Sequence, residues 1–287
     1  MERTLSTEER TSFERDGYLI LSDLLTPAET TDLQDWAQEV HDWPNNEDSP
    51  WMAYAEINAQ GKQVLCRTEN YAASHQGLNA LLRGEKLLSI LHQLSGEDMV
   101  LFKEKINYKL AGSGGFAAHI DATAYTHVKK IQHLAILLAV DPSSPSNGGL
   151  EVVPGSHKTS IPLGDDNCIA PSWIERQNWL PITLSPGQVL IFGSYLAHRS
   201  GANTSDADRK ALYATYNVKR EGDLHDEYYA RRKVEFPPTH LRKKGDRFDE
   251  GAMRGNRGGK SIRKLKHKIE SSSLPPADSP STIKEKD

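Results

Sequence analysis

Residues 112–121 have the sequence GSGGFAAHID, a glycine-rich turn that leads into a short extended run ending in His119 and Asp121. In a β-strand, residues two positions apart point to the same side. His119 and Asp121 can therefore present an imidazole nitrogen and a carboxylate oxygen to one metal ion. A His-x-Asp pair also occurs by chance in many proteins, so the prediction of a metal site needs a third ligand from elsewhere in the chain.

Residues 186–201, PGQVLIFGSYLAHRSG, supply that third ligand in His198. A Pro-Gly turn opens a buried strand, and the histidine follows it. Two histidines and one carboxylate on one face of Fe(II) leave three coordination positions open. We expect two of these positions to take a chelating 2-oxo acid and the third to take O2.

Arg209 lies eleven residues after His198, at the start of the apolar run 210–217. If that run pairs antiparallel with residues 188–192, Arg209 lies near the metal. Its planar guanidinium can bind the far carboxylate of 2-oxoglutarate through two parallel hydrogen bonds, and Ser200 can donate its hydroxyl to the same group. A buried arginine with no acidic side chain beside it needs an anion, which a dicarboxylic cosubstrate supplies.

Short β-runs separated by Gly, Pro, Ser and Asn fill the middle of the chain and predict a barrel or sandwich rather than alternating βα units. These runs are residues 100–110, 133–140, 149–153, 188–192 and 211–218. Helices are expected ahead of this β-core, beginning at the N-cap signals Ser6 and Thr26 and covering residues 77–94. Residues 41–63 are expected to form a surface loop or a lid.

The composition limits the classes of function. A formal net charge of −4 argues against general nucleic-acid binding, because a surface that follows phosphates normally leaves a basic excess. Two cysteines a hundred residues apart make no disulfide framework and no zinc motif. Without an apolar leader or a membrane-spanning run, we expect a soluble, cytoplasmic protein.

The end of the chain differs in composition from the rest. Residues 242–268 are dense in Arg, Lys and Gly, and residues 271–280 are rich in Ser and Pro. So few apolar residues cannot offset the entropy of ordering. We therefore expect one domain over residues 1–240 and a flexible tail over residues 241–287.

Four segments together resemble the phytanoyl-CoA dioxygenase family of Fe(II)/2-oxoglutarate oxygenases, which includes ectoine hydroxylases and fungal natural-product oxygenases. They are Phe13-x3-Gly17-Tyr18, His119-Ile120-Asp121, residues 147–157 (NGGLEVVPGSH) and His198-x10-Arg209, and the resemblance covers about residues 10–220. It implies a mostly β fold with flanking helices around a double-stranded β-helix, the jelly-roll core of cupin-like proteins. It also implies His119, Asp121 and His198 as iron ligands, with Arg209 and Ser200 on 2-oxoglutarate.

The resemblance extends to residues that contact the cosubstrate or the substrate. It places Asn107 and Lys103 of the strand 100–110 against the cosubstrate, although lysine stands at 103 where we would expect glutamine. It places Tyr125, with the neighbouring Thr126, in the wall of the substrate pocket. His157, by contrast, follows a Pro-Gly turn, and we expect a structural role for it.

The expected reaction is oxidation of a C–H bond in a small polar metabolite or natural-product intermediate, with Fe(II), 2-oxoglutarate and O2 as cofactor and cosubstrates. Desaturation, cyclisation or rearrangement would use the same ligands, and a non-catalytic metal-binding sensor is an alternative of another class. Asp121 argues against a halogenase, which lacks this carboxylate. The segments 51–58 and 122–128 carry little positive charge, which argues against a long acyl-CoA. The sequence leaves the oligomeric state open, a homodimer included.

Overall fold

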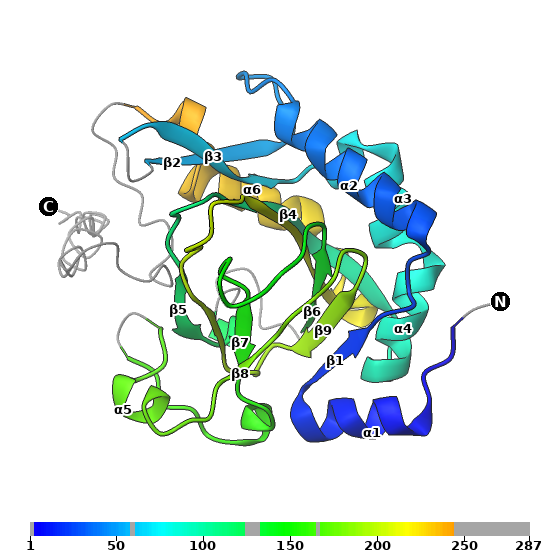
Figure 1. Cartoon of the computed structure of the whole chain (residues 1–287). Coiled ribbons are helices and arrows are strands. Elements are labelled where there is room, and N and C mark those ends of the chain that lie inside the picture. The colour runs from blue at the N-terminus through cyan, green and yellow to red at the C-terminus, as the bar shows by residue number, and fades with distance from the viewer. Residues whose placement is uncertain (1–2, 58–60, 124–132, 165–166, 244–287) are drawn as a thin grey trace, which may run out of the picture. The chain divides into compact units, whose positions relative to one another are not determined.

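The computed structural model describes residues 3–57, 61–123, 133–164 and 167–243 of the chain. Within them, two antiparallel β-sheets face each other, and helices cover the outer face of the larger sheet (Figure 1). The α-helices are α1 (Thr7–Asp16), α2 (Pro27–Asp42), α3 (Gln76–Arg83), α4 (Glu85–Ser95), α5 (Pro171–Ile174) and α6 (His225–Glu235). Single 3-10 turns are η1 (Ala72–Ser74), η2 (Asp121–Thr123), η3 (Ser156–Lys158), η4 (Lys219–Glu221) and η5 (Thr239–Leu241).

The larger sheet has seven strands in the order β1-β9-β6-β11-β4-β3-β2, and the smaller has four in the order β5-β10-β7-β8. Most neighbours in space are distant in sequence, so chain crossings build both sheets together. The expectation of a mostly β fold with flanking helices is confirmed. The strands are β1 (Tyr18–Leu21), β2 (Met52–Ile57), β3 (Gln63–Glu69), β4 (Met99–Lys109), β5 (Phe116–His119), β6 (His133–Ala139), β7 (Leu150–Val152), β8 (Leu180–Pro181), β9 (Val189–Gly193), β10 (His198–Ser200) and β11 (Arg209–Val218).

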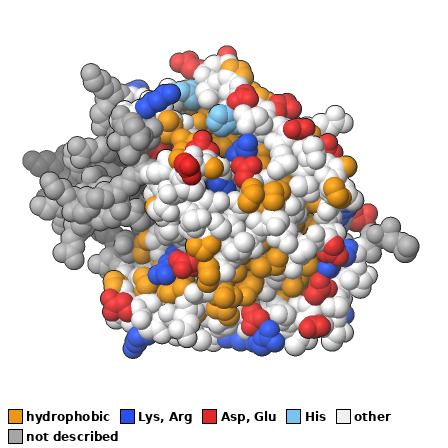
Figure 2. Space-filling model, viewed as in Figure 1, with side chains coloured by type: hydrophobic (Ala, Val, Ile, Leu, Met, Phe, Trp, Pro, Cys, Tyr) orange, Lys and Arg blue, Asp and Glu red, His pale blue; other side chains and the backbone are white. Residues whose placement is uncertain are grey.

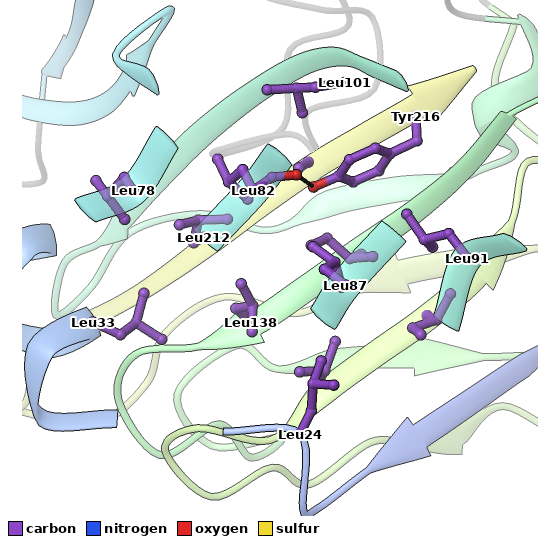
Figure 3. Close-up of a cluster of buried hydrophobic side chains, with 14 of the residues drawn as sticks. Leu24, Leu33, Leu78, Leu82, Leu87, Leu91, Leu101, Leu138, Leu212 and Tyr216 are labelled. Carbon is purple, nitrogen blue, oxygen red and sulfur yellow. Dashed lines mark hydrogen bonds between the residues drawn. The ribbon is translucent and has the colours of Figure 1, made fainter. Parts of the chain in front are cut away.

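The largest buried cluster lies between the seven-stranded sheet and helices α2, α3 and α4 (Figure 3). The helices contribute mainly leucines at three- and four-residue spacing, which places them on one face. Tyr216 of β11 lies in the same cluster and donates a hydrogen bond of 2.8 Å to the carbonyl of Leu82. This bond satisfies a phenol that is fully buried, and it joins the sheet to α3.

A second cluster fills part of the space between the two sheets and borders the cavity that holds the site. Its strands supply small and branched side chains: Ala135, Leu137, Ala139, Leu150, Val152, Leu190, Phe192 and Ala211. Three of these, Ala135, Leu150 and Phe192, also line the cavity. The inner faces of the sheets are therefore apolar except where polar side chains line the cavity.

The structure corrects two expectations about local elements. The run 77–94 forms two helices, because the backbone at Gly84 is extended (φ −78°, ψ 152°). A side chain at Gly84 would collide with the carbonyl of Ala80. The expected loop at 41–63 contains strand β2, whose first three residues are buried against the rest of the sheet.

The strand pairing expected around Arg209 is also wrong. β11 pairs with β4 and β6, and β9 pairs with β6 and β1. β6 therefore lies between the two strands that we expected to be neighbours. Arg209 is not among the residues that line the cavity, but it pairs with Lys109, whose Nζ bonds to the cavity residue Ser200.

The described surface carries charges of both signs. On the face seen in Figure 2, acidic and basic side chains are interspersed, and the described residues show no continuous basic surface there. Within the same part of the chain, no helix has the length and apolar character to cross a bilayer.

Candidate active site

Three potential metal ligands meet at one end of the smaller sheet. His119 ends β5, His198 begins β10, and the two residues lie directly opposite each other in the antiparallel ladder. Asp121 opens the turn η2, two residues after His119. Its Oδ1 lies 3.7 Å from His119 Nε2 and 3.8 Å from His198 Nε2, and one ligand atom from each residue falls within 4.8 Å of the others.

Both imidazole rings are oriented by the backbone. His119 Nδ1 lies 2.7 Å from the carbonyl of Ala117, and His198 Nδ1 lies 2.9 Å from the carbonyl of Leu196. Because a carbonyl only accepts, each Nδ1 donates a proton, and the lone pair of each Nε2 faces Asp121. A backbone partner on the second nitrogen is the usual way in which a metal-binding histidine is fixed.

The charges of the three groups suit a divalent cation. Burial lowers the pKa of His119 to about 3, and the neighbouring His198 adds to this effect. Burial by itself would raise the pKa of Asp121, but the two histidines outweigh it and hold that pKa at about 2. At neutral pH the cluster therefore presents an imidazole lone pair and a carboxylate, and it can bind a cation without first losing protons.

A second polar group lies at the end of β11 and β4. Arg209 and Lys109 are direct cross-strand partners, and both are buried. Arg209 donates through Nε to the carbonyl of Asn147 (3.2 Å) and through Nη2 to that of Gly148 (3.0 Å). Its buried Nη1 has no hydrogen-bond partner among the described residues. A guanidinium with a buried donor to spare fits an anionic ligand.

Lys109 is a site residue that the sequence reasoning missed. Its Nζ donates to Ser200 Oγ at 3.0 Å and to the carbonyls of Gly148 and Gly201 at 2.9 and 2.6 Å. The sequence could have indicated Lys109, because Lys103, Lys105, Asn107 and Lys109 stand at every second position of one strand and therefore share one face of it.

The structure brings most of the other expected residues to the same cavity. Asn107, Lys103 and Ser200 line it together with His119, Asp121 and His198. Phe116, Leu150, Phe192 and Tyr213 form the apolar and aromatic part of its wall. Tyr125 and Thr126 lie outside the described residues.

His157 has the structural role that we expected. Its Nε2 lies 3.2 Å from the carbonyl of Glu14, and its ring packs against Gly17 at the end of α1. The histidine therefore ties the first helix to the turn after β7. In the described part of the chain it lies in no cluster of potential metal ligands.

Comparison with known proteins agrees with this geometry. The model of the family described as "Phytanoyl-CoA dioxygenase (PhyH)" matches residues 13–211. The chain is 35% identical over 255 residues to the 2-aminoethylphosphonate dioxygenase of an uncultured bacterium, HF130_AEPn_1, covering 88% of this chain and 96% of that relative. It is 38% identical over 237 residues to the methylphosphonate hydroxylase of Gimesia maris, covering 82% and 90%.

The fold is that of solved iron and 2-oxoglutarate enzymes. The crystal structure of EctD from S. alaskensis with 2-oxoglutarate and 5-hydroxyectoine superposes with a TM-score of 0.66 at 23% identity, over 75% of this chain and 77% of that one. The jelly-roll, cupin-like core expected from the sequence is thereby confirmed. The chain belongs to the phytanoyl-CoA dioxygenase family, the Fe(II)- and 2-oxoglutarate-dependent dioxygenases.

Proposed function

We propose that this dioxygenase oxidises a C–H bond of a small polar molecule at an iron held by His119, Asp121 and His198. The observation that carries the proposal is the orientation of the two histidines, whose Nδ1 protons are both directed to backbone carbonyls. That arrangement leaves two Nε2 lone pairs and one carboxylate facing a common point, which is the donor set of a facial triad. Bound iron, with 2-oxoglutarate and O2, supplies the oxidising power, and succinate and CO2 are released.

Arg209, Lys109 and Ser200 are proposed to hold the far carboxylate of 2-oxoglutarate. Arg209 offers its unpartnered Nη1, and Lys109 brings a second positive charge that is already bonded to Ser200 Oγ. Two cations and a hydroxyl match a carboxylate better than a neutral group. Asn107 lines the cavity between this end and the iron ligands, and we propose that it contacts the body of the cosubstrate.

The apolar wall has a role of its own. Phe116, Leu150 and Phe192 limit access of water to the reacting centre, and a dry cavity strengthens each electrostatic contact within it. The substrate is proposed to be compact and polar. Two relatives are named for activity on 2-aminoethylphosphonate and methylphosphonate, so small phosphonates are the first compounds to assay.

Two alternatives lead to different experimental results. Desaturation, cyclisation or rearrangement would use the same residues and would differ only in the product. A metal-binding sensor would bind iron without decarboxylating 2-oxoglutarate. Arg209 and Lys109 stand side by side on neighbouring strands, and this favours an enzyme, because a metal sensor needs no binding site for 2-oxoglutarate.

The test is the Asp121→Ala variant, measured for iron binding and for succinate release. The variant loses the anionic ligand, so we expect iron affinity to fall by a factor of ten or more and coupled turnover to disappear. Asp206→Ala, at an exposed aspartate, is the matched control and should behave as wild type. Wild-type turnover in Asp121→Ala would refute the assignment.

A further inference from the structure

Lys105 and Glu69 are cross-strand partners that do not pair with each other. They lie directly opposite in the ladder between β4 and β3. Side chains at such positions start about 5 Å apart on the same face, and a lysine opposite a glutamate normally forms an ion pair. Here the glutamate is turned toward two arginines instead.

Glu69 is fully engaged by those arginines. Arg67 Nε lies 2.8 Å from its Oε1, and Arg232 of α6 reaches Oε2 through Nε at 3.0 Å and Oε1 through Nη2 at 3.2 Å. Burial would raise the pKa of Glu69, but Arg232 and Arg67 outweigh it and hold that pKa at about 2. Glu69 is only 3% exposed, and both of its oxygens contact a guanidinium group rather than Lys105.

The arginines are themselves fixed by aromatic rings. The guanidinium of Arg67 lies 4.5 Å from the centre of the Tyr54 ring, and that of Arg232 lies 4.6 Å from the Phe236 ring. Stacked guanidinium groups keep their orientation. The direction of Glu69 is therefore set by β2, β3 and α6 together.

Lys105 extends into the cavity that holds the iron ligands. Its Nζ lies 5.1 Å from the Tyr213 ring centre and 6.0 Å from that of Phe116, and it lines the cavity with His119 and Asp121. Among the described residues, no carboxylate lies within ion-pair distance of this Nζ. Burial and then the charge of Arg67 lower the pKa of Lys105 to about 8, as expected for an ammonium without a counter-ion.

Lys103 adds a second charge on the same face of β4, two residues away. Burial, and after it the repulsion from Lys105, lowers the pKa of Lys103 to about 7. Two basic side chains on one face of the cavity wall favour an anionic ligand. Lysine acts as a point charge and is a common ligand of phosphate groups.

We propose that Lys105 binds a phosphonate group of the substrate, and that Arg67 and Arg232 keep Lys105 available by holding Glu69. Lys103, which the family resemblance places against the cosubstrate, is assigned to the substrate beside Lys105 instead. The seat lies next to the 2-oxoglutarate end, because the Nζ atoms of Lys105 and Lys109 lie 6.0 and 5.9 Å from the centre of the same Phe116 ring. Arg232 is a positioning residue that acts through Glu69. The inference rests on the proposed function and names the substrate class for the same site.

The first experiment is calorimetric binding of methylphosphonate and 2-aminoethylphosphonate to the enzyme loaded with Fe(II) and 2-oxoglutarate, without O2. In Lys105→Met we expect affinity for both probes to fall roughly 30-fold or more, since a buried charge pair is lost. Affinity for 2-oxoglutarate should stay unchanged, and the melting temperature should not fall, because a buried charge is removed. Lys158→Met, at an exposed lysine, is the control. Unchanged binding in Lys105→Met would overturn the proposal.

The second experiment tests the role of Arg232 by rescue. Arg232→Met leaves Arg67 as the only arginine on Glu69, at Oε1, so that Oε2 can pair with Lys105. We therefore expect phosphonate affinity to fall roughly tenfold, the value of a modest ion pair. Adding Glu69→Gln removes the competing carboxylate and should restore the affinity. If α6 had only a structural role, the double variant would bind no better than Arg232→Met, and this outcome would contradict the mechanism.

The results separate this inference from the function on which it rests. Tighter binding of propionate and β-alanine than of the phosphonates would overturn the substrate class, while iron-dependent decarboxylation of 2-oxoglutarate would leave the function standing. The proposed function would instead be overturned if the wild-type enzyme did not decarboxylate 2-oxoglutarate and if Asp121→Ala bound iron as tightly as the wild type.

Discussion

The side chains of this site are held in place mainly by backbone groups. His119 and His198 each bond to the carbonyl of the residue two positions earlier, and Arg209 and Lys109 both bond to carbonyls of the segment 147–148 or 201. Backbone carbonyls neutralise no charge. The hydrogen bonds to these carbonyls therefore fix the direction of the Arg209 and Lys109 side chains without neutralising their charge.

At this scale, Arg209→Met is expected to raise the apparent KM for 2-oxoglutarate roughly 30-fold or more, with a much smaller change in the KM for the substrate. The reason is loss of a charge-assisted contact in a buried place. Succinate release at varied 2-oxoglutarate measures the effect. An unchanged KM would assign the carboxylate to Lys109 alone. The control is Arg199→Met. Arg199 also lines the cavity, but its Nε is already paired with Glu151 Oε2 at 2.8 Å.

Elements are joined to each other by a few specific contacts. α1 ends at Gly17, whose left-handed backbone (φ 84°) turns the chain directly into β1. The ring of His157 occupies the space that a side chain at Gly17 would need. The helix end, the first strand and the turn after β7 are thus packed at one point, which explains why glycine and histidine stand at these two positions.

Gly17→Ala is expected to destabilise the protein by more than the left-handed backbone alone accounts for, about 2 kcal/mol or more. Gly96→Ala is the matched control, because Gly96 has φ 74° with no atom within 4 Å of an added side chain. It should cost about 1 kcal/mol. Denaturant unfolding of both variants gives the comparison, and equal losses would show that the His157 ring moves aside freely.

Helix α6 contacts the part of β4 that β3 no longer pairs with. β3 ends its pairing with β4 at Glu69, and beyond it the Tyr229 hydroxyl accepts from Glu104 N at 3.0 Å and donates to Glu104 O at 2.7 Å. His225 Nε2 lies 2.9 Å from the Glu104 carboxylate in the same buried place. Together with Arg232, these contacts dock α6 on the sheet.

The His225 contact makes α6 docking dependent on pH. Burial would lower the pKa of His225, but the hydrogen bond to Glu104 outweighs it and raises that pKa above its usual value. A raised folded-state pKa stabilises the protein below about pH 6.5, and this contribution is lost as the pH rises through the folded-state value. His225→Gln should therefore lower the free energy of unfolding more at pH 6 than at pH 8.5.

Urea unfolding of wild type and His225→Gln at the two pH values measures this difference. A cost that is the same at both pH values would mean that His225 is neutral in the folded protein throughout.

At the scale of the whole molecule, the helices stabilise the outer face of the large sheet and leave the inner face to the site. The cluster under α2, α3 and α4 and the cavity use opposite faces of the same strands, so β4 carries Ile106 and Tyr108 outward and Lys105 and Asn107 inward. Alternation along one strand thus separates stability from chemistry. Substitutions in the cavity can change function with little effect on the main core.

Deleting residues 245–287 is expected to leave both the melting temperature and turnover nearly unchanged. That segment is basic and rich in Ser, Pro and Gly, and its composition supports little apolar burial. Deletion of residues 225–287 is the contrasting variant: it also removes Tyr229 and Arg232, and it should lower stability strongly. A large loss from the shorter deletion would show that the tail docks on the domain or on a partner.

Several features followed from sequence because they depend on residues close together in the chain. Ser6 and Thr26 cap their helices through reciprocal bonds with Glu9 and Glu29, three residues on. The spacing of His119 and Asp121 predicted that they meet, although the strand ends at His119 and Asp121 lies in the following 3-10 turn. The glycine turn and the strand before His198 are equally local. Arg209 was inferred from a strand pairing that the structure corrects, and the family resemblance named the same residue independently.

Tertiary structure decided what depends on sheet order. β6 lies between β9 and β11, Lys109 reaches Ser200, and Arg232 reaches Glu69 from a helix that the sequence analysis did not predict. These contacts join segments between 91 and 163 residues apart. Strand pairing is chosen by burial of whole faces, which leaves no signal within a few residues. Whether Lys105 is paired or available is therefore decided by the fold, and not by the sequence around it.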